Sequence, residues 1–299
     1  MTKLDLKKLV YLSFSLIVAF ALYKLFGAEN ALGEANFTVL LLSLLLFLAN
    51  VLFWNFAWAS VAKIPYKEAN AAGFSSLAGF LTPLGVGSDF LRGFFASKTK
   101  SLPVLLASSF ATKIYKLSIA AILLLASLPL FFNSVDERIR FALVASTSAI
   151  FSAVIVFKVF RIDKWKVTQS FLAGSIGGKA RDVYKNLHAL LVVPSLKVVA
   201  FLFFSLAFEF AAFYTVFAAF GIFLPASQSV SAFLMLFLAS KAFLPQGFGV
   251  VEAVGLLLFE GVFATPVLAA VILSWDAVRA WIPAVLSFVF AFLRRGSRT

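Results

Sequence analysis

The sequence predicts an all-α, polytopic membrane protein with about six spanning helices and two re-entrant helical hairpins in an inverted repeat. Three observations lead to this fold class. The chain of 299 residues is 62% hydrophobic and 13% charged, with a mean hydropathy of +1.01, whereas soluble domains average about 45–50% apolar and about 25% charged residues. The apolar residues form runs long enough to cross a bilayer. A short phrase of proline and glycine occurs twice, each time inside such a run.

The predicted spanning helices are apolar runs that reach the length of about 20 residues needed to cross a bilayer. They are Leu9–Gly27, Asn36–Ala62, Leu102–Leu130, Ile139–Phe160, Leu196–Phe220 and Thr265–Leu293. The first run lacks a small-residue cleavage site, so we expect it to be a spanning helix and not a removed signal peptide. We interpret residues 1–299 as a single transmembrane domain.

Two further apolar regions, Ala69–Ser97 and Ser227–Glu260, each contain the phrase P-x-G-x-G. Its helix-breaking positions are Pro83, Gly85 and Gly87 in the first region and Pro245, Gly247 and Gly249 in the second. Proline lacks an N–H and glycine costs backbone entropy, so both break helices. Backbone groups freed at membrane depth must be satisfied by protein or by a water-filled cavity. We therefore expect each region to be a re-entrant hairpin hinged at its phrase.

Basic residues orient the chain, because cytoplasmic loops carry an excess of Lys and Arg. Lysines precede the first predicted helix, and Arg294, Arg295 and Arg298 follow the last, so both termini are expected in the cytoplasm. Residues 161–195 form a basic, amphipathic segment, which we expect as cytoplasmic helices on the inner leaflet with a turn at Gly177-Gly178. The net charge of +13 thus reflects topology, and no nucleic-acid partner is expected.

The hairpins place residues 36–130 and 196–293 in opposite orientations, which is an inverted-topology repeat. Residue spacing supports the repeat: Asp89 precedes Glu252 by the same interval that separates Lys113 from Asp276 and Lys116 from Arg279. Pro83 precedes Pro245 by one position fewer. Inverted repeats with paired broken segments are typical of carriers whose binding site lies at the repeat interface.

Charged residues at membrane depth are the candidate site, because each costs about 2.5–3.5 kcal/mol on insertion scales. The basic residues are Arg92, Lys113, Lys116, Lys241 and Arg279, and the acidic residues are Asp89, Glu209, Glu252 and Asp276. One interpretation is a network in which these groups only neutralise one another. The other is a polar cavity in which the bases bind an anionic lipid head group, most naturally a phosphate, through the common face of Lys113 and Lys116. The acids would then carry a coupling ion or balance the charge.

Four further polar and aromatic residues lie along the second predicted helix: Asn50, Trp54, Asn55 and Trp58. Helix packing and interfacial anchoring account for them. The chain contains no Cys and no metal-ligand spacing, and its only histidine, His188, lies in the segment 161–195. We therefore predict no catalytic residue, no metal and no cofactor, and expect that the chain is not an enzyme.

The stretches Leu81–Gly87 and Leu244–Ala253 resemble the flippase-like transmembrane region of the lysylphosphatidylglycerol synthase family. That family reads close to P-G-G-x-G-x-x-E-A at the second stretch, and only Gln246 departs from it. The chain ends just after its last predicted helix, so we expect a stand-alone membrane domain without an aminoacyl-transferase domain. The resemblance implies movement of a lipid with a charged head group between leaflets.

The first functional hypothesis is a flippase that moves an anionic phospholipid or a polyprenyl-phosphate-linked lipid between leaflets of the cell (plasma) membrane. Its partners would be membrane lipids with anionic head groups. The alternatives are a membrane-embedded lipid-modifying enzyme and an accessory subunit of a membrane glycosyltransferase, which the segment 161–195 would contact.

Overall fold

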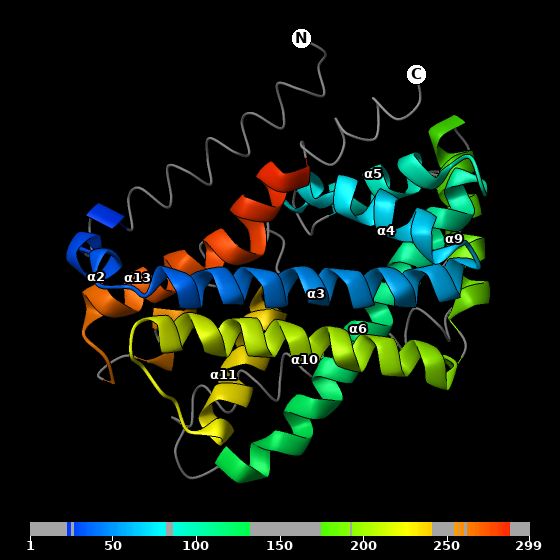
Figure 1. Cartoon of the computed structure of the whole chain (residues 1–299). Helices are drawn as coiled ribbons and strands as arrows, with labels where there is room; N and C mark the ends of the chain where they lie inside the picture. Colours follow the sequence, from blue (N-terminus) through cyan, green and yellow to red (C-terminus); the bar gives the residue numbers. More distant parts are fainter. Residues whose placement is uncertain are drawn as a thin grey trace.

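The computed structural model describes residues 23–24, 27–81, 86–131, 175–191, 193–240, 254–256, 258–259 and 262–287, and the regular structure in these ranges is helical (Figure 1). Its helices long and apolar enough to cross a membrane are Phe37–Ala62, Leu102–Ser127, Leu196–Ala219 and Thr265–Ser287. Each begins within one residue of a predicted span. Two other predicted spans, Leu9–Gly27 and Ile139–Phe160, lie wholly or largely outside the described residues.

Helices α3 (Phe37–Ala62) and α10 (Leu196–Ala219) lie side by side and antiparallel along one side of the bundle (Figure 1). Both start at capping residues, whose side chains accept hydrogen bonds from backbone N–H groups of the first turn. Hydrogen bonds spaced two helical turns apart join the two helices. The backbone N–H of Asn36 donates to the carbonyl of Ala219 at 2.8 Å, and Ser43 Oγ donates to the carbonyl of Ala212 at 2.7 Å. Residue numbers therefore rise along α3 as they fall along α10, so the two helices are antiparallel.

The first predicted hairpin contains two short helices that pack side by side, α4 (Tyr66–Ser75) and α5 (Val86–Ala96). The short 3-10 helix η1 (Leu77–Leu81) follows α4. At 10 and 11 residues, α4 and α5 are too short to span a bilayer singly. Glycine is required at Gly79, because a Cβ there would lie 2.2 Å from Ser88 N.

The helix-breaking phrase lies at the junction of these elements. Of these elements, η1 is described to Leu81 and α5 from Val86, and Gly87 lies in the first turn of α5. Pro83 and Gly85 lie outside the described residues, as do Pro245, Gly247 and Gly249 of the second phrase. The described residues on either side of that second phrase are α11 (Ala226–Ala239) and the helical residues 254–256.

The remaining described helices leave one side of the α3–α10 pair uncovered, where Leu41 of α3 and Phe203 of α10 are exposed. These helices are α2 (Glu29–Gly33), α6 (Leu102–Phe131), α9 (Ser175–Leu190) and α13 (Thr265–Asp276). A π-helical turn, η3 (Ala277–Trp281), follows α13, and helical structure continues to residue 287. The short helix η1 also contacts this last segment, because the backbone N–H of Ala78 donates to Ser287 Oγ at 2.9 Å.

The predicted turn at Gly177-Gly178 is wrong, since both glycines lie in the first turns of α9. The first N–H groups of a helix have no intrahelical partner, so little hydrogen bonding depends on these positions. The C-terminal half of α9 is fixed by packing. Its Leu187, with the following Leu191, packs against Ala107 and Ala111 of α6. His188 accordingly lies in a packed helix.

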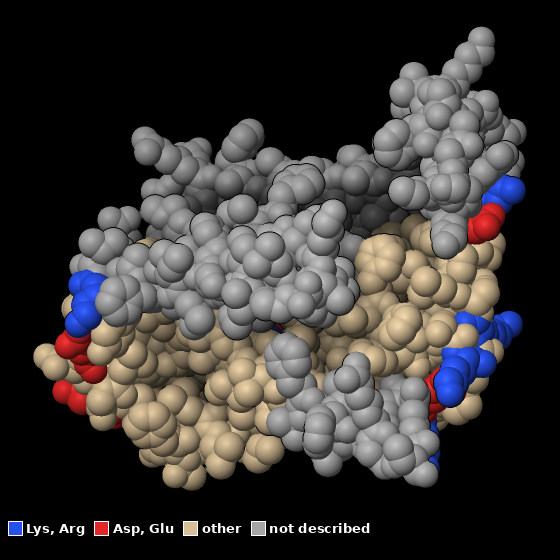
Figure 2. Space-filling model, turned by 90° about the horizontal axis from the view of Figure 1, so that it is seen from above, with Lys and Arg blue, Asp and Glu red and all other residues tan. Residues whose placement is uncertain are grey.

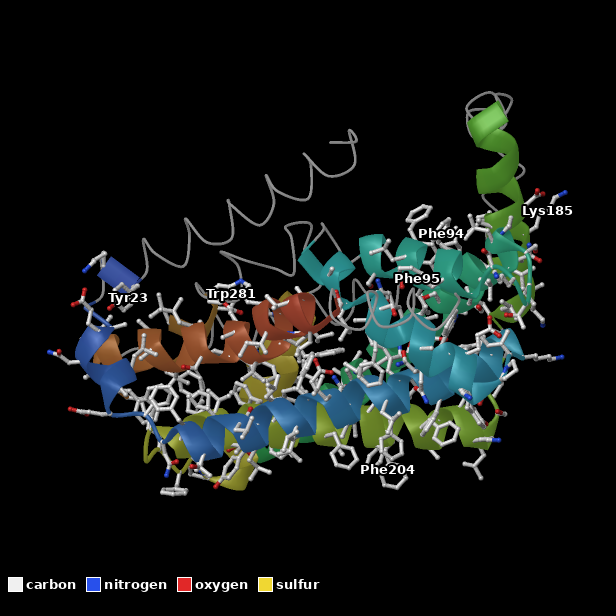
Figure 3. The ribbon with its side chains drawn as sticks, turned by 45° about the horizontal axis from the view of Figure 1, so that its top comes forward. Tyr23, Phe94, Phe95, Lys185, Phe204 and Trp281 are labelled. Carbon is white, nitrogen blue, oxygen red and sulfur yellow. The ribbon has the colours of Figure 1, made fainter. Side chains whose placement is uncertain are left out.

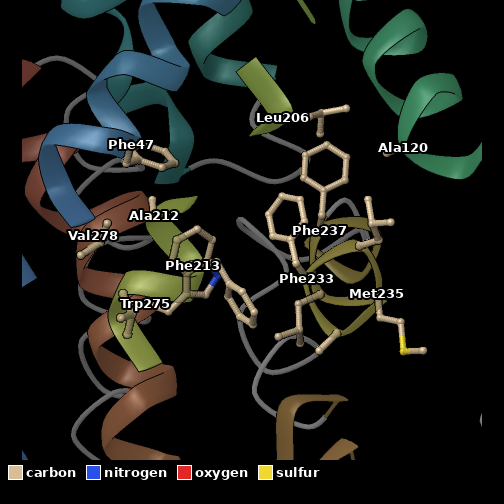
Figure 4. Packing of buried hydrophobic residues seen from close by; sticks show 14 of the residues in the cluster. Phe47, Ala120, Leu206, Ala212, Phe213, Phe233, Met235, Phe237, Trp275 and Val278 are labelled. Carbon is tan, nitrogen blue, oxygen red and sulfur yellow. The ribbon is translucent and has the colours of Figure 1, made fainter. Parts of the chain in front are cut away.

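The core is rich in aromatic side chains that meet edge to face (Figure 4). The rings of Phe213 and Trp275 lie 5.5 Å apart at 83°, and Phe47 meets Trp275 at 6.4 Å and 86°. The outer surface is also apolar, and Figure 3 shows Phe94 and Phe204 pointing away from the bundle. Among the described residues on the face seen in Figure 2, charged side chains gather at the two ends of the molecule, and the described surface between the ends is mostly uncharged. This distribution is that of a bundle surrounded by lipid.

Candidate functional site

The buried charges lie inside the bundle, where α3, α5, α6 and α10 meet. Asp89 and Arg92 are on α5, Lys113 and Lys116 on α6, and Glu209 on α10. Asp276 and Arg279 lie at the end of α13 and in η3. Lys241 and Glu252 lie outside the described residues. Among the described residues, the predicted charges form three ion pairs, and Arg92 is a further base outside these pairs.

The first ion pair joins α5 to α6. Asp89 is fully buried and forms an ion pair with the ammonium group of Lys113 through Oδ2. Its other oxygen, Oδ1, accepts a hydrogen bond of 2.6 Å from Ser109 Oγ. Both carboxylate oxygens are thus engaged, and the pair fixes α5 against the spanning helix.

The second ion pair joins three helices. Lys116 Nζ donates to Glu209 Oε2 at 2.7 Å, to Ser205 Oγ at 2.8 Å and to Asn50 Oδ1 at 2.9 Å. Ser205 Oγ in turn donates to Asn50 Oδ1 at 2.6 Å. An ammonium group has three N–H donors, and here each has a protein acceptor. Lys116 therefore holds α6, α3 and α10 together and has no donor left for a ligand in this arrangement.

The third ion pair lies within one turn of the last helix. Arg279 Nε lies 2.7 Å and Nη2 2.5 Å from Asp276 Oδ1. Asp276 Oδ2 is buried and has no hydrogen-bond partner within the described ranges. Arg279 belongs to the π-helical turn, and such turns are rare and frequently occur at functional sites.

Arg92 is the further base. It is fully buried, and within the part of the chain that the structure describes none of its three guanidinium nitrogens has a hydrogen-bond partner. The guanidinium carbon lies 4.5 Å from the ring centroid of Trp54 and 5.2 Å from that of Trp58, both on α3. Trp58 is itself held in place, because its Nε1 donates to Ser108 Oγ at 3.0 Å.

Asn55 adds a second unsatisfied group on the same helix. It is fully buried, and neither atom of its amide has a hydrogen-bond partner among the described residues. A Cβ at Gly73 of α4 would lie 2.1 Å from Asn55 Oδ1, so the glycine makes room for this amide. Buried polar groups without partners are uncommon in native proteins and indicate water, an ion or a ligand.

Sequence reasoning found the charged residues but assigned the indoles elsewhere. Helix packing and interfacial anchoring were expected for Trp54 and Trp58. Both are buried, as packing requires, but their rings also lie against Arg92, which was not predicted. The available signal was their spacing. Asn50, Trp54 and Trp58 recur every four residues and therefore lie on one face of α3.

These features define a class of protein: a multi-pass helical membrane protein whose interior holds ion pairs and a buried arginine that lies against two indole rings. Residues 8–287 match the family model described as the lysylphosphatidylglycerol synthase TM region. The match covers nearly the whole chain, and the protein belongs to this family. No curated protein and no solved structure matches the chain.

Proposed function

We propose that the protein is a lipid flippase in which Arg92 receives the negatively charged head group of a membrane lipid. The observation that carries this proposal is the buried Arg92 guanidinium, which has no hydrogen-bond partner within the described ranges and lies against two indole rings. Membership of a family linked to lipid flipping supports it.

Arginine suits a phosphate better than lysine does. Its five N–H donors form a planar fork that binds two phosphate oxygens at once, and charge-assisted hydrogen bonds of this kind are roughly twice as strong as neutral ones. Contacts with Trp54 and Trp58 on α3 hold the fork in place before any ligand arrives. A preorganised site loses less entropy on binding.

The ion pairs would support this site. Lys113 and Lys116 are paired with Asp89 and Glu209, so we assign them to positioning α5, α6 and α10 around Arg92. In the proposal, α4 and α5 form the re-entrant hairpin that carries Arg92 to membrane depth. Asp276, whose Oδ2 has no hydrogen-bond partner among the described residues, is the carboxylate that we propose for a coupling proton or cation.

Leaflet exchange in proteoliposomes tests the proposal. Fluorescent phosphatidylglycerol or phosphatidylcholine is placed in both leaflets, and the outer leaflet is bleached with dithionite. We expect the wild-type protein to speed exchange of phosphatidylglycerol, Arg92→Gln to remove most of this activity, and the exposed Lys67→Gln to leave it unchanged. Folded wild-type protein that exchanges no anionic lipid would refute the proposal. Activity of Arg92→Gln equal to wild type would show that the head group binds elsewhere.

A further inference from the structure

A recess lies at the end of the α3–α10 pair, remote along the helices from the Asn36 contact. It forms where α3 ends, α4 begins and α10 begins, and its volume is about 420 Å³. Its polar lining residues are Ser60, Lys63, Tyr66, Ser195 and Lys197. Neither Arg92 nor any of the paired interior charges lines the recess, so it is distinct from the Arg92 site.

The recess is positively charged. Its described lining residues include two lysines and three hydroxyl groups and no carboxylate. Lys63 ends α3 in the left-handed conformation, with φ of 54°. Lys197 Nζ lies 5.2 Å from the ring centroid of Tyr66, and its hydrogen bond to the hydroxyl lowers the pKa of Tyr66. The N-terminus of α10 lies at the recess, and the positive end of its helix dipole also favours an anion.

An aromatic stripe leads from the recess along the outer surface of the α3–α10 pair. Phe56 lies 5.2 Å from Tyr66 and 5.5 Å from Phe201 between ring centroids. One turn further along α3, Phe53 lies 5.5 Å from Phe204 and stacks on Phe208 at 5.3 Å. Phe204 is half exposed and points outward (Figure 3). The stripe therefore continues into the apolar band that faces lipid.

We propose that this recess binds one phospholipid with an anionic head group, its phosphate between Lys63 and Lys197 and its acyl chains along the aromatic stripe. A free phosphate would match the lysines but not the aromatic surface that adjoins them. A zwitterionic lipid would match the stripe but gain less from the two positive charges. The site does not require translocation, and it holds its lipid whether or not Arg92 is functional.

Each basic residue near an anionic lipid surface contributes about 1 kcal/mol, which corresponds to about fivefold in affinity. Loss of both lysines should therefore weaken binding of the anionic lipid by at least tenfold. The chain has no native cysteine, so a single introduced cysteine can be labelled without ambiguity. Leu196 is a suitable position, because it is 83% exposed and lies between the lining residues Ser195 and Lys197.

The experiment places a fluorophore on Leu196→Cys in the full chain, in nanodiscs that contain doxyl-labelled phosphatidylglycerol or doxyl-labelled phosphatidylcholine at equal fractions. We expect stronger quenching by phosphatidylglycerol. The preference should disappear in Lys63→Gln/Lys197→Gln and persist in the matched control Lys67→Gln/Lys185→Gln, whose lysines are exposed but do not line the recess. It should also persist in Arg92→Gln, which separates this site from the flippase proposal.

Two results would overturn the inference. Equal quenching by the two lipids, or an unchanged preference in Lys63→Gln/Lys197→Gln, would show that the recess does not select an anionic head group. Reversal of the quenching by millimolar inorganic phosphate at constant ionic strength would assign the recess to a soluble anion and not to a lipid.

Discussion

Replacing Arg92 by methionine should make the protein more stable while removing its ability to move lipid. The substitution keeps a long, flexible and apolar side chain in a site of similar volume. Asp89 is not orphaned by the change, because Ser109 and Lys113 still engage its two oxygens. The variant therefore isolates the free energy of the buried guanidinium itself.

The magnitude follows from the contacts. A buried polar group without a partner costs about 1–3 kcal/mol, and within the described ranges Arg92 has three such nitrogens. Contacts with the rings of Trp54 and Trp58 return about 0.5–2 kcal/mol each. The midpoints are about 6 kcal/mol for the three nitrogens and about 2.5 kcal/mol for the two rings, and the Coulombic attraction of Asp89 also favours the guanidinium, so the balance favours removal by about 2 kcal/mol. At about 2–4 °C per kcal/mol, the Tm should rise by roughly 5 °C.

Thermal unfolding in detergent, with and without phosphatidylglycerol, is the assay. All proteins compared carry Lys63→Gln/Lys197→Gln, which removes lipid binding at the outer recess, and this double variant is the parent. A ligand at one hundred times its Kd stabilises the folded protein by about 2.7 kcal/mol. Phosphatidylglycerol should therefore raise the Tm of the parent. It should leave the Tm of Arg92→Met unchanged, because this variant lacks the base that binds the head group. The exposed Lys98→Met serves as the control for loss of a positive charge and should behave like the parent.

The reasoning would be refuted by a fall in Tm for Arg92→Met in the absence of lipid, since the guanidinium would then be satisfied. It would equally be refuted if phosphatidylglycerol stabilised Arg92→Met as much as the parent, because the interior subsite would then lie elsewhere.

The remaining predictions concern the packing around the site. Lys116→Met should destabilise the protein by about 3–5 kcal/mol, because it leaves Glu209 charged and buried. The double variant Lys116→Met/Glu209→Leu removes both charges and should recover most of this lost stability in thermal unfolding. A double variant no more stable than Lys116→Met would contradict a pairing role for these two residues. Gly79→Ala should lower the Tm by several degrees and slow lipid exchange, since its Cβ would meet Ser88 N at 2.2 Å. Gly33→Ala, whose Cβ meets nothing within 4 Å, is its control, and equal Tm values for the two variants would argue against a close approach of η1 to α5.

The spanning helices could be predicted from sequence because their signals are local. Hydropathy defines the runs that became α3, α6, α10 and α13, and Asn36 and Ser195 are residues that commonly cap a helix. The turn at Gly177-Gly178 was predicted from the same kind of signal and is wrong, because tertiary packing of α9 on α6 outweighs the weak helix propensity of two glycines.

The pairing of charges is not a local property, and the sequence alone did not reveal it. Lys113 and Lys116 are separated by less than one turn of α6 and were expected to share one anion. They turn to different neighbours instead, Lys113 to Asp89 on α5 and Lys116 to Glu209 on α10. Which acid meets which base depends on the helices that pack on either side of α6.

This pairing sharpens the choice between a neutralising network and a binding site. Three of the predicted bases each have a carboxylate from the predicted acids, which is what a network requires and what stabilises the bundle. Arg92 is the described base without such a hydrogen bond. Evolution retains a costly, unsatisfied buried group chiefly where function needs it. A transported lipid must also bind and then leave, so the base that binds its head group should not be permanently paired with a protein carboxylate. The network and the site are therefore parts of one arrangement, in which the ion pairs hold the helices and Arg92 remains available for the lipid.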